Sequence, residues 1–457
     1  MKRNAFTLVE LLAVIGILAV ILTITIPIIG NYIKDKKKDS FFISAKNILR
    51  HVEAEGLYDN EINARLNMLN LTDLKEENYD IEGSYVYTKD GELHLTLKGK
   101  GKFKGLYICG LTSSIKENNV VETECSEDSF KVNLADYITR LYNNEETRTS
   151  NGLKKDNTED ENIRYYGSDP NNYVRFNNEL WRIIGVFGEN IKLVRSEKLG
   201  NLSWDSSEST INSGYGINQW GESTDTNGNS YAGSDLQVYL NNMYYGGVEV
   251  MCYKTSNNTT ITCPTKMLDE ISKSLIDNHT WNTGAINLND STIVNLQSYE
   301  MNTVPFYNAE RGTVNGKICS SGNYCNNDVV TRTTTWTGYV GLPYPTDYSY
   351  ASSESVCETN MNAGNINIQK QIYNMTCKKN NWMHHGSTMQ EGSWTLSTVA
   401  HPNRAFGIWF IYGGGLVGDE RASLPLMVFP SVYLKNKVKI ESGNGTSSNP
   451  YILKLGN

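Results

Sequence analysis

The 457-residue sequence predicts an α+β protein, in which a long N-terminal helix packs on a small antiparallel sheet and a large β-rich domain follows. Three observations lead to this class. Apolar residues dominate 6–29, and their helical spacing continues beyond that segment. Apolar and polar residues then alternate between Gly83 and Cys109, as in half-buried strands. The chain also contains 38 Gly and 28 Tyr, which suits many short strands joined by turns.

The N-terminal segment begins with a short basic stretch, Met1–Ala5, and continues as an apolar helix. Leu11–Ile29 has no charged residue, and at about 1.5 Å per residue it spans roughly 28 Å. Because this length matches the hydrocarbon core of a bilayer, we expect residues 6–29 to anchor the chain as a single membrane pass. A cleaved secretory signal peptide is the alternative, but no small-residue cleavage site follows the apolar run.

One carboxylate, Glu10, lies at the edge of this apolar stretch. Its burial without a partner would be costly, so it requires a cation or a proton. The arrangement of Phe6-Thr-Leu-Val-Glu10 after a basic leader resembles the N-terminal motif of type IV prepilins. The resemblance implies cleavage between Ala5 and Phe6 by a prepilin peptidase, methylation of the Phe6 amine, and pairing of Glu10 with the amine of a neighbouring subunit. It also implies that Pro27 interrupts the helix. Ala5 departs from the glycine that usually ends the leader.

Residues 30–126 are expected to form a pilin-like unit of one helix and an antiparallel sheet. Apolar residues at spacings of three and four give this helix one stripe: Phe42, Ala45, Ile48, Leu49 and Val52. Strands are expected at 83–88, 92–98 and 102–109, with Asp90-Gly91 as a hairpin turn. The resemblance to pilins implies that the sheet packs against the stripe.

Eight cysteines follow the apolar segment, and they fall into four neighbouring pairs. These pairs are Cys109 with Cys125, Cys252 with Cys263, Cys319 with Cys325, and Cys357 with Cys377. Such pairing predicts disulfides that close short loops in an oxidising compartment, so the body of the protein is expected outside the cytoplasm. Zinc is the alternative, but no pair has C-x-x-C spacing and no histidine lies beside one at ligand spacing.

Residues 127–164 are expected to be a linker, because their central part, 143–162, is polar and carries few large apolar side chains. A β-rich extracellular domain is expected at 165–457. Four stretches with Trp, Gly and other aromatic residues mark it: Asn178–Ile183, Gly392–Trp394, Ala405–Trp409 and Phe429–Leu434. The pattern resembles the C-type-lectin-like and formylglycine-generating-enzyme-like domains of bacterial surface proteins.

Calcium is the one cofactor that the sequence suggests. Asp225, Asn227, Asn229 and Asp235 offer oxygen ligands at alternating positions, as calcium loops require, although the twelfth-position Glu of an EF-hand is missing. The same residue types build ordinary turns, so no metal site is assigned.

Catalytic residues are not assigned either. The spacing of Cys357 and Cys377 suits a structural disulfide rather than a reactive pair, and His384-His385 suits a surface loop. Aromatic residues offer stacking platforms for sugars or protein partners, or alternatively pack in the core: Trp204, Trp220, Trp336 and the Tyr339–Tyr350 stretch.

The sequence therefore predicts a minor type IV pilin-like surface protein whose head binds a glycan or protein ligand. Its expected partners are other pilin subunits, the prepilin peptidase, the membrane and a surface ligand. Nucleic acid is not expected, because the net charge is −8. The first alternative is a pseudopilin of a type II secretion or DNA-uptake machine, and the second is a membrane-tethered surface enzyme.

Overall fold

The computed structural model describes most of the chain, with gaps between the described segments. The described residues are 8–54, 63–66, 77–89, 92–123, 125, 133–206, 219–224, 230–231, 233–253, 260–295, 298, 300–314, 317–318, 334–362, 376–386, 391–400 and 407–456. The chain divides into two compact units, Met1–Val132 and Asn133–Asn457, which are called unit 1 and unit 2.

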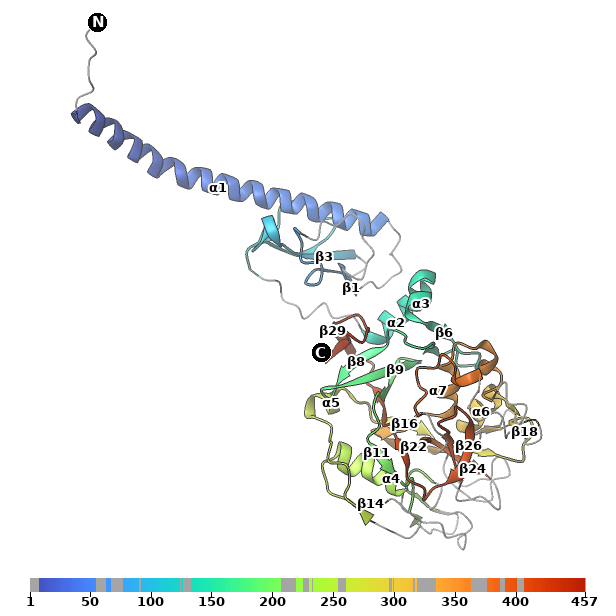
Figure 1. The fold of residues 1–457 in the computed structure, drawn as a ribbon. Coiled ribbons are helices and arrows are strands. Elements are labelled where there is room, and N and C mark those ends of the chain that lie inside the picture. The colour runs from blue at the N-terminus through green and yellow to red at the C-terminus, as the bar shows by residue number, and fades with distance from the viewer. Residues whose placement is uncertain are drawn as a thin grey trace. The chain divides into compact units, whose positions relative to one another are not determined.

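Unit 1 contains one long helix and a five-stranded antiparallel sheet (Figure 1). Helix α1 spans Leu8–Ala54. The strands follow one another across the sheet in chain order: β1 Asn63–Arg65, β2 Tyr85–Lys89, β3 Glu92–Lys98, β4 Tyr107–Leu111 and β5 Val120–Val121. A short 3-10 helix, Gly101–Phe103, connects β3 to β4.

The second half of α1 packs on this sheet, because its apolar residues share one face of the helix. The buried residues of that face are Phe41, Phe42, Ala45, Leu49 and Val52. The sheet side of the same core contributes Leu93, Leu95, Leu97, Ile108 and Leu111. The ring of Phe41 lies 5.0 Å from the ring of Phe103, so the 3-10 helix closes one end of the core.

Unit 2 is built on two larger sheets. The first has the order β23-β28-β10-β9-β8-β30-β29, and β7 pairs with both β6 and β9 beside it. Its strands are β6 Leu153–Lys155, β7 Ile163–Tyr165, β8 Tyr173–Phe176, β9 Glu179–Phe187, β10 Asn190–Arg195, β23 Val340–Gly341, β28 Ser431–Leu434, β29 Val438–Ser442 and β30 Tyr451–Leu455. The second has the order β11-β27-β24-β25-β26, with β17 beside β24. Its strands are β11 Gly200–Leu202, β17 Ala285–Asn287, β24 Ser393–Ala400, β25 Gly407–Ile411, β26 Val417–Arg421 and β27 Leu426–Val428.

Short helices and two-stranded ribbons complete unit 2. The helices are α2 Leu134–Asn143, α3 Glu145–Asn151, α4 Asp235–Val238, the π-helix Tyr239–Tyr245, α5 Glu270–Leu275, α6 Thr303–Glu310, α7 Pro345–Tyr350, and the 3-10 helices Ser355–Glu358 and Thr376–Lys378. The ribbons pair β12 Ser223–Thr224 with β13 Ser230–Tyr231, β14 Cys252–Tyr253 with β15 Thr260–Ile261, β16 His279–Asn282 with β22 Thr335–Gly338, β18 Val294–Asn295 with β19 Glu300–Met301, and β20 Thr313–Val314 with β21 Lys317–Ile318.

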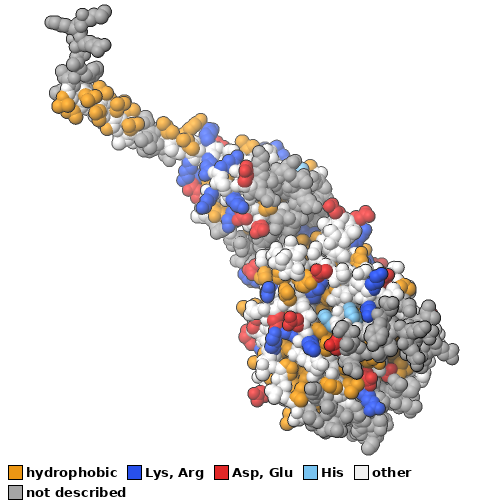
Figure 2. Space-filling view, viewed as in Figure 1, with side chains coloured by type: hydrophobic (Ala, Val, Ile, Leu, Met, Phe, Trp, Pro, Cys, Tyr) orange, Lys and Arg blue, Asp and Glu red, His pale blue; other side chains and the backbone are white. Residues whose placement is uncertain are grey.

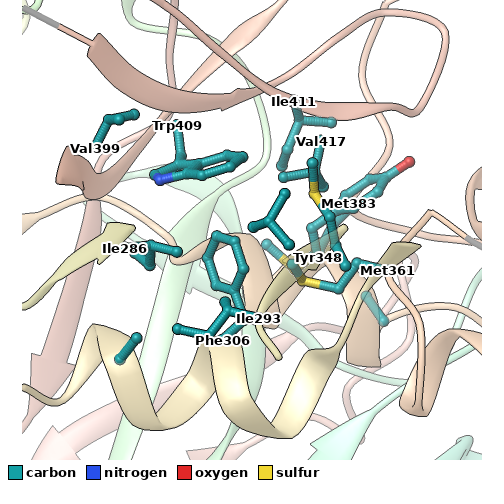
Figure 3. Packing of buried hydrophobic residues seen from close by; sticks show 14 of the residues in the cluster. Ile286, Ile293, Phe306, Tyr348, Met361, Met383, Val399, Trp409, Ile411 and Val417 are labelled. Carbon is teal, nitrogen blue, oxygen red and sulfur yellow. The ribbon is translucent and has the colours of Figure 1, made fainter. Parts of the chain in front are cut away.

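The main apolar core of unit 2 lies where the second sheet meets α6 and α7. Trp409 and Phe306 are fully buried there, and their rings meet edge to face at a centroid distance of 5.0 Å (Figure 3). Met361 and Met383 fill the space beside Tyr348 in the same core. The unbranched thioether side chain suits such irregular gaps.

The α+β class predicted for the chain is wrong. Of the residues described, 33% lie in strands and 29% in helices, so the chain is mostly β-sheet. Helix is concentrated in α1, and in unit 2 the longest described α-helix has only 10 residues. The β-rich prediction fits unit 2 alone. The reason is that the two large sheets of unit 2 pair many short segments that are remote from one another in the chain, and local patterns do not mark such pairings.

The linker predicted at 127–164 is also wrong over most of its length, because 133–164 belongs to the folded part of unit 2. The Asn133 side chain caps α2 by accepting a hydrogen bond from the Ala135 amide at 2.8 Å. Gly152 ends α3 in the left-handed conformation, with φ of 65°, and a Cβ there would meet the Tyr166 carbonyl oxygen at 2.5 Å. Polar residues in this segment therefore cap helices and line a turn, although α3 itself has no buried residue.

Candidate functional site

The first half of α1 carries an apolar surface that nothing in unit 1 covers among the described residues. Leu8, Ile17 and Ile33 are 74%, 61% and 59% exposed, whereas Phe41 is fully buried. Figure 2 shows apolar side chains gathered along this part of the helix. A Cβ added at Gly16 would meet no atom within 4 Å. Helix α1 thus has an exposed apolar half, from Leu8 to Ile33, and a packed half, from Phe41 to Val52. The exposed apolar half is called the bare half of α1.

The structure describes the prepilin-like motif only in part. Ala5 and Phe6 fall outside the described residues, and Glu10 is described only as part of the helical backbone. Helix α1 runs past Pro27 without a break, so the proline does not end the helix. In the described part of the chain, no helix has both the length and the apolar content that a membrane span requires.

Charged contacts hold α1 to the last strand of the unit 1 sheet. Glu122, which follows β5, accepts ion pairs from Lys34 at 2.8 Å and from Lys38 at 2.7 Å. Hydrogen bonds from these two lysines lower the pKa of Glu122 to about 2. Asn118 also donates to Asp39 at 3.0 Å. These contacts begin near the residue at which the bare half of α1 gives way to the packed half.

Three of the four predicted cysteine pairs form disulfides. They are Cys109–Cys125, Cys252–Cys263 and Cys357–Cys377. The fourth predicted pair, Cys319 and Cys325, lies outside the described residues. Disulfides of this kind are typical of an extracellular or secreted protein.

The calcium candidates are only partly described. Asp225, Asn227 and Asn229 lie outside the described residues. Asp235 is at the first position of α4, where its carboxylate accepts a hydrogen bond from the Ser206 amide at 2.7 Å. Across the described segments, no group of three or more His, Cys, Asp or Glu side chains is arranged to hold a metal ion.

Most of the aromatic residues predicted as stacking platforms are buried instead. Trp204 and Trp220 are 0% and 1% exposed, and Tyr344, at 1% exposure, represents the buried tyrosines of the Tyr339–Tyr350 stretch. Trp336 and Tyr339 differ, because both are only partly buried. The ring of Trp336 meets Trp220 edge to face at a centroid distance of 6.1 Å, whereas the ring of Tyr339 stacks on Tyr245 at 4.0 Å and an angle of 8°. The stacked Tyr245–Tyr339 pair is the flatter of these two candidate platforms.

A fully buried group of charges lies between the first sheet of unit 2 and α7. It consists of Lys192 on β10, Asp347 on α7, Arg164 on β7 and Asp156 after β6, and it is called the buried ion cluster. Lys192 Nζ lies 2.6 Å from Asp347 Oδ2, and Arg164 Nη1 donates to Asp347 Oδ1, also at 2.6 Å. Arg164 Nε donates to Asp156 Oδ2 at 2.9 Å. The side chains of Lys192 and Asp347 are 0% and 1% exposed.

Aromatic rings surround the lysine of this cluster. Lys192 Nζ lies 4.0 Å from the ring centre of Tyr344, 5.3 Å from that of Trp281 and 5.4 Å from that of Tyr433. Burial lowers the pKa of Lys192 to about 8 against the opposing effect of Asp347. Burial would raise the pKa of Asp347, but Lys192 and Arg164 outweigh it and keep that pKa below its ordinary value.

A third buried carboxylate, Glu310 at the end of α6, lies near this cluster. It accepts hydrogen bonds from the Thr346 hydroxyl at 2.6 Å and from the Thr346 amide at 3.3 Å. Complete burial raises its pKa to about 7, although Arg311 beside it acts in the opposite direction.

Sequence reasoning missed the buried ion cluster. One signal was present: Lys192 lies between the apolar residues Ile191, Leu193 and Val194 in the middle of its strand. A lone lysine in such a strand requires a buried partner. Its partner, Asp347, is 155 residues away in the chain, and no local pattern marks it. Comparisons of the chain with protein-family models, with curated proteins and with solved structures found no match.

Proposed function

We propose that this protein is a minor type IV pilin-like subunit, in which the bare half of α1 packs among the helices of other subunits and unit 2 is an extracellular head for adhesion. The observation that carries this proposal is the division of α1 into a packed half and an exposed apolar half. No catalytic role is assigned to the head.

The energetics favour a partner for the bare half. Leu11, Leu12, Ile15, Ile17, Leu18, Ile21 and Leu22 are each about half exposed or more. Complete burial of one such side chain contributes about 1.5–3 kcal/mol relative to full exposure. Several of them together offset the cost of association, and helices with matching apolar surfaces are suitable partners.

The prepilin-like motif supplies the route to assembly in this proposal. A prepilin peptidase would cleave between Ala5 and Phe6, and Glu10 would then pair with the new amine of a neighbouring subunit. Before assembly, the uncharged stretch Leu11–Ile29 would hold the subunit in the membrane.

The head would contact its ligand through partly exposed aromatic rings. Sugars and protein side chains both stack on such surfaces, and the Tyr245–Tyr339 pair offers one flat face on unit 2. We therefore expect Tyr339→Ala to weaken surface adhesion while leaving assembly intact.

The experiment combines processing and assembly. The N-terminal sequence of the protein from envelope fractions would be determined with and without the prepilin peptidase, and we expect methylated Phe6 as the first residue only when the peptidase is present. Ile17→Lys would then be compared with Ile271→Lys in the assembled fraction. Ile271 is the matched control, because it is 75% exposed on unit 2, whereas Ile17 is 61% exposed on the bare half.

We expect Ile17→Lys to remove the protein from the assembled fraction and Ile271→Lys to leave it there. Retention of Met1 in both strains would exclude the processing route. Equal assembly of both variants would exclude the bare half of α1 as the assembly surface.

A further inference from the structure

The contact between Lys192 and Asp347 places an amine beside a carboxyl group in the interior of unit 2. The two side chains come from β10, a central strand of the first sheet, and from α7. Nζ and Oδ2 are 2.6 Å apart, and the side chains are 0% and 1% exposed. A reactive pair therefore lies at contact distance, away from solvent.

Aromatic side chains surround this pair and exclude water from it. Rings of Tyr344, Trp281, Tyr433 and Phe187 lie between 4.0 and 5.8 Å from Lys192 Nζ. Removing two charges from water is costly, and their attraction often only balances that cost. An apolar site holds little water. Condensation of an amine with a carboxyl group is therefore favoured there, because hydrolysis of the amide needs water that the site excludes.

We propose that Lys192 and Asp347 join in an intramolecular isopeptide bond that links β10 covalently to α7. The Lys192 ammonium transiently gives one proton to Asp347 Oδ2, against the lowered pKa of that carboxyl group, which leaves a neutral amine beside a neutral carboxyl group. Nζ then attacks Cγ, a second proton passes from nitrogen to Oδ2, and the Cγ–Oδ2 bond breaks. The products are one amide and one water molecule, so atoms and charge balance and no further reactant is needed.

Two neighbours of Asp347 assist this reaction. Arg164 Nη1 lies 2.6 Å from Oδ1, the oxygen that carries negative charge when Nζ attacks and that remains as the amide carbonyl. The backbone amide of Tyr344 donates to Oδ2 at 2.9 Å and fixes the carboxyl plane at the start of α7. Burial also lowers the pKa of Lys192 to about 8, so a fraction of the amine is neutral at neutral pH.

Unit 2 contains a matched pair that lacks these surroundings. Lys154 Nζ lies 3.0 Å from Glu358 Oε1, but the two side chains are 15% and 28% exposed. Water reaches this pair and solvates its charges. We therefore expect Lys154 and Glu358 to remain an ion pair.

The test is the intact mass of the full purified chain after reduction and alkylation of its cysteines. We expect the mass to be lower by one water molecule than the mass calculated from the sequence with every cysteine alkylated, which is the full sequence mass in this test. A tryptic digest should contain a branched peptide that joins the segments of Lys192 and Asp347, with no cleavage after Lys192. Fragmentation of that peptide locates the bond.

Two variants complete the test. Lys192→Arg should restore the full sequence mass, because a guanidinium does not form the amide, whereas Lys154→Arg should keep the loss of one water. A wild-type chain of full sequence mass overturns the proposal, and this result does not depend on whether either variant folds. A branched peptide at another lysine, or a water loss that persists in Lys192→Arg, overturns it as well.

Discussion

Replacing Phe41 with alanine tests whether the packed half of α1 holds the sheet of unit 1 together. Phe41 is fully buried, and its ring lies 5.0 Å from Phe103 and 6.2 Å from Tyr79. Truncation of a buried phenylalanine to alanine costs about 3–5 kcal/mol. The loss of two ring contacts places Phe41→Ala in the upper part of this range. Since small domains are stable by about 5–15 kcal/mol, the change removes a large share of the stability of unit 1.

Amide hydrogen exchange in the full chain measures this loss directly. Strand β3 is the suitable reporter, because it pairs with β2 and β4 and so exchanges only when the sheet opens. Each 1.4 kcal/mol is a factor of ten, so we expect exchange at Leu95 and Leu97 to be about a thousandfold faster in Phe41→Ala. Ile43→Ala is the control: Ile43 is 60% exposed on the same helix, and its truncation should change the stability by no more than about 0.5 kcal/mol. Exchange in Phe41→Ala within about threefold of the wild type would refute the assigned role of this interface.

Three further predictions concern unit 2. Burial raises the pKa of Glu310 to about 7, so the folded protein binds this proton more tightly than the unfolded chain does. The free energy of unfolding should therefore be highest below the pKa of Glu310 in the unfolded chain. It should fall by up to about 3 kcal/mol as the pH rises from about 4.5 to 7. Glu310→Gln should flatten this dependence in urea titrations, and an unchanged slope would contradict it. Removal of the Cys357–Cys377 disulfide, which closes a separation of 20 residues, by alanine at both positions should lower the unfolding free energy by about 3 kcal/mol in urea titrations under oxidising conditions, and an unchanged free energy would contradict this role. Gly185→Ala would place a Cβ 2.2 Å from the Ile163 carbonyl oxygen, so we expect a loss of about 3 kcal/mol or more in thermal unfolding; a variant as stable as the wild type would show that β7 and β9 separate without cost.

Local patterns in unit 1 predicted the buried face of its helix and the position of β3. They did not predict β1 or β5, and the strand expected at 102–109 begins only at Tyr107, after the 3-10 helix Gly101–Phe103. The spacing of Phe42, Ala45, Leu49 and Val52 identified the face of the helix that lies on the sheet, because a stripe with a period of 3.6 residues has only one way to be buried. Alternation located β3 at the predicted residues, Glu92–Lys98. Disulfide pairing followed from short separations in the chain, which confine each cysteine to a nearby partner.

Ion pairs between remote residues of unit 2 could not be predicted from the sequence. The segment around Asp156 and Arg164 is polar, and its composition indicated an exposed linker. Arg164 is nevertheless 1% exposed, because Asp347 supplies its counter-charge from 183 residues further along the chain. A polar segment is buried when its charges find partners, and composition alone carries no information on such partners. The same reason explains why the α+β class failed: the weight of strand in unit 2 depends on pairings between remote segments.

The two ends of unit 2 meet at one edge of its first sheet. Asn133, its first residue, forms a bridge to Lys439 on β29, and β30 lies parallel to β8, with Tyr451 beside Val174. A domain whose entry and exit points are neighbours resembles a cassette: it attaches to a host chain at a single place, and the host needs no second opening to accept it. Recombination between genes could therefore exchange unit 2 as a whole. A graft of 133–456 onto a loop of another protein should leave the fold of that protein unchanged.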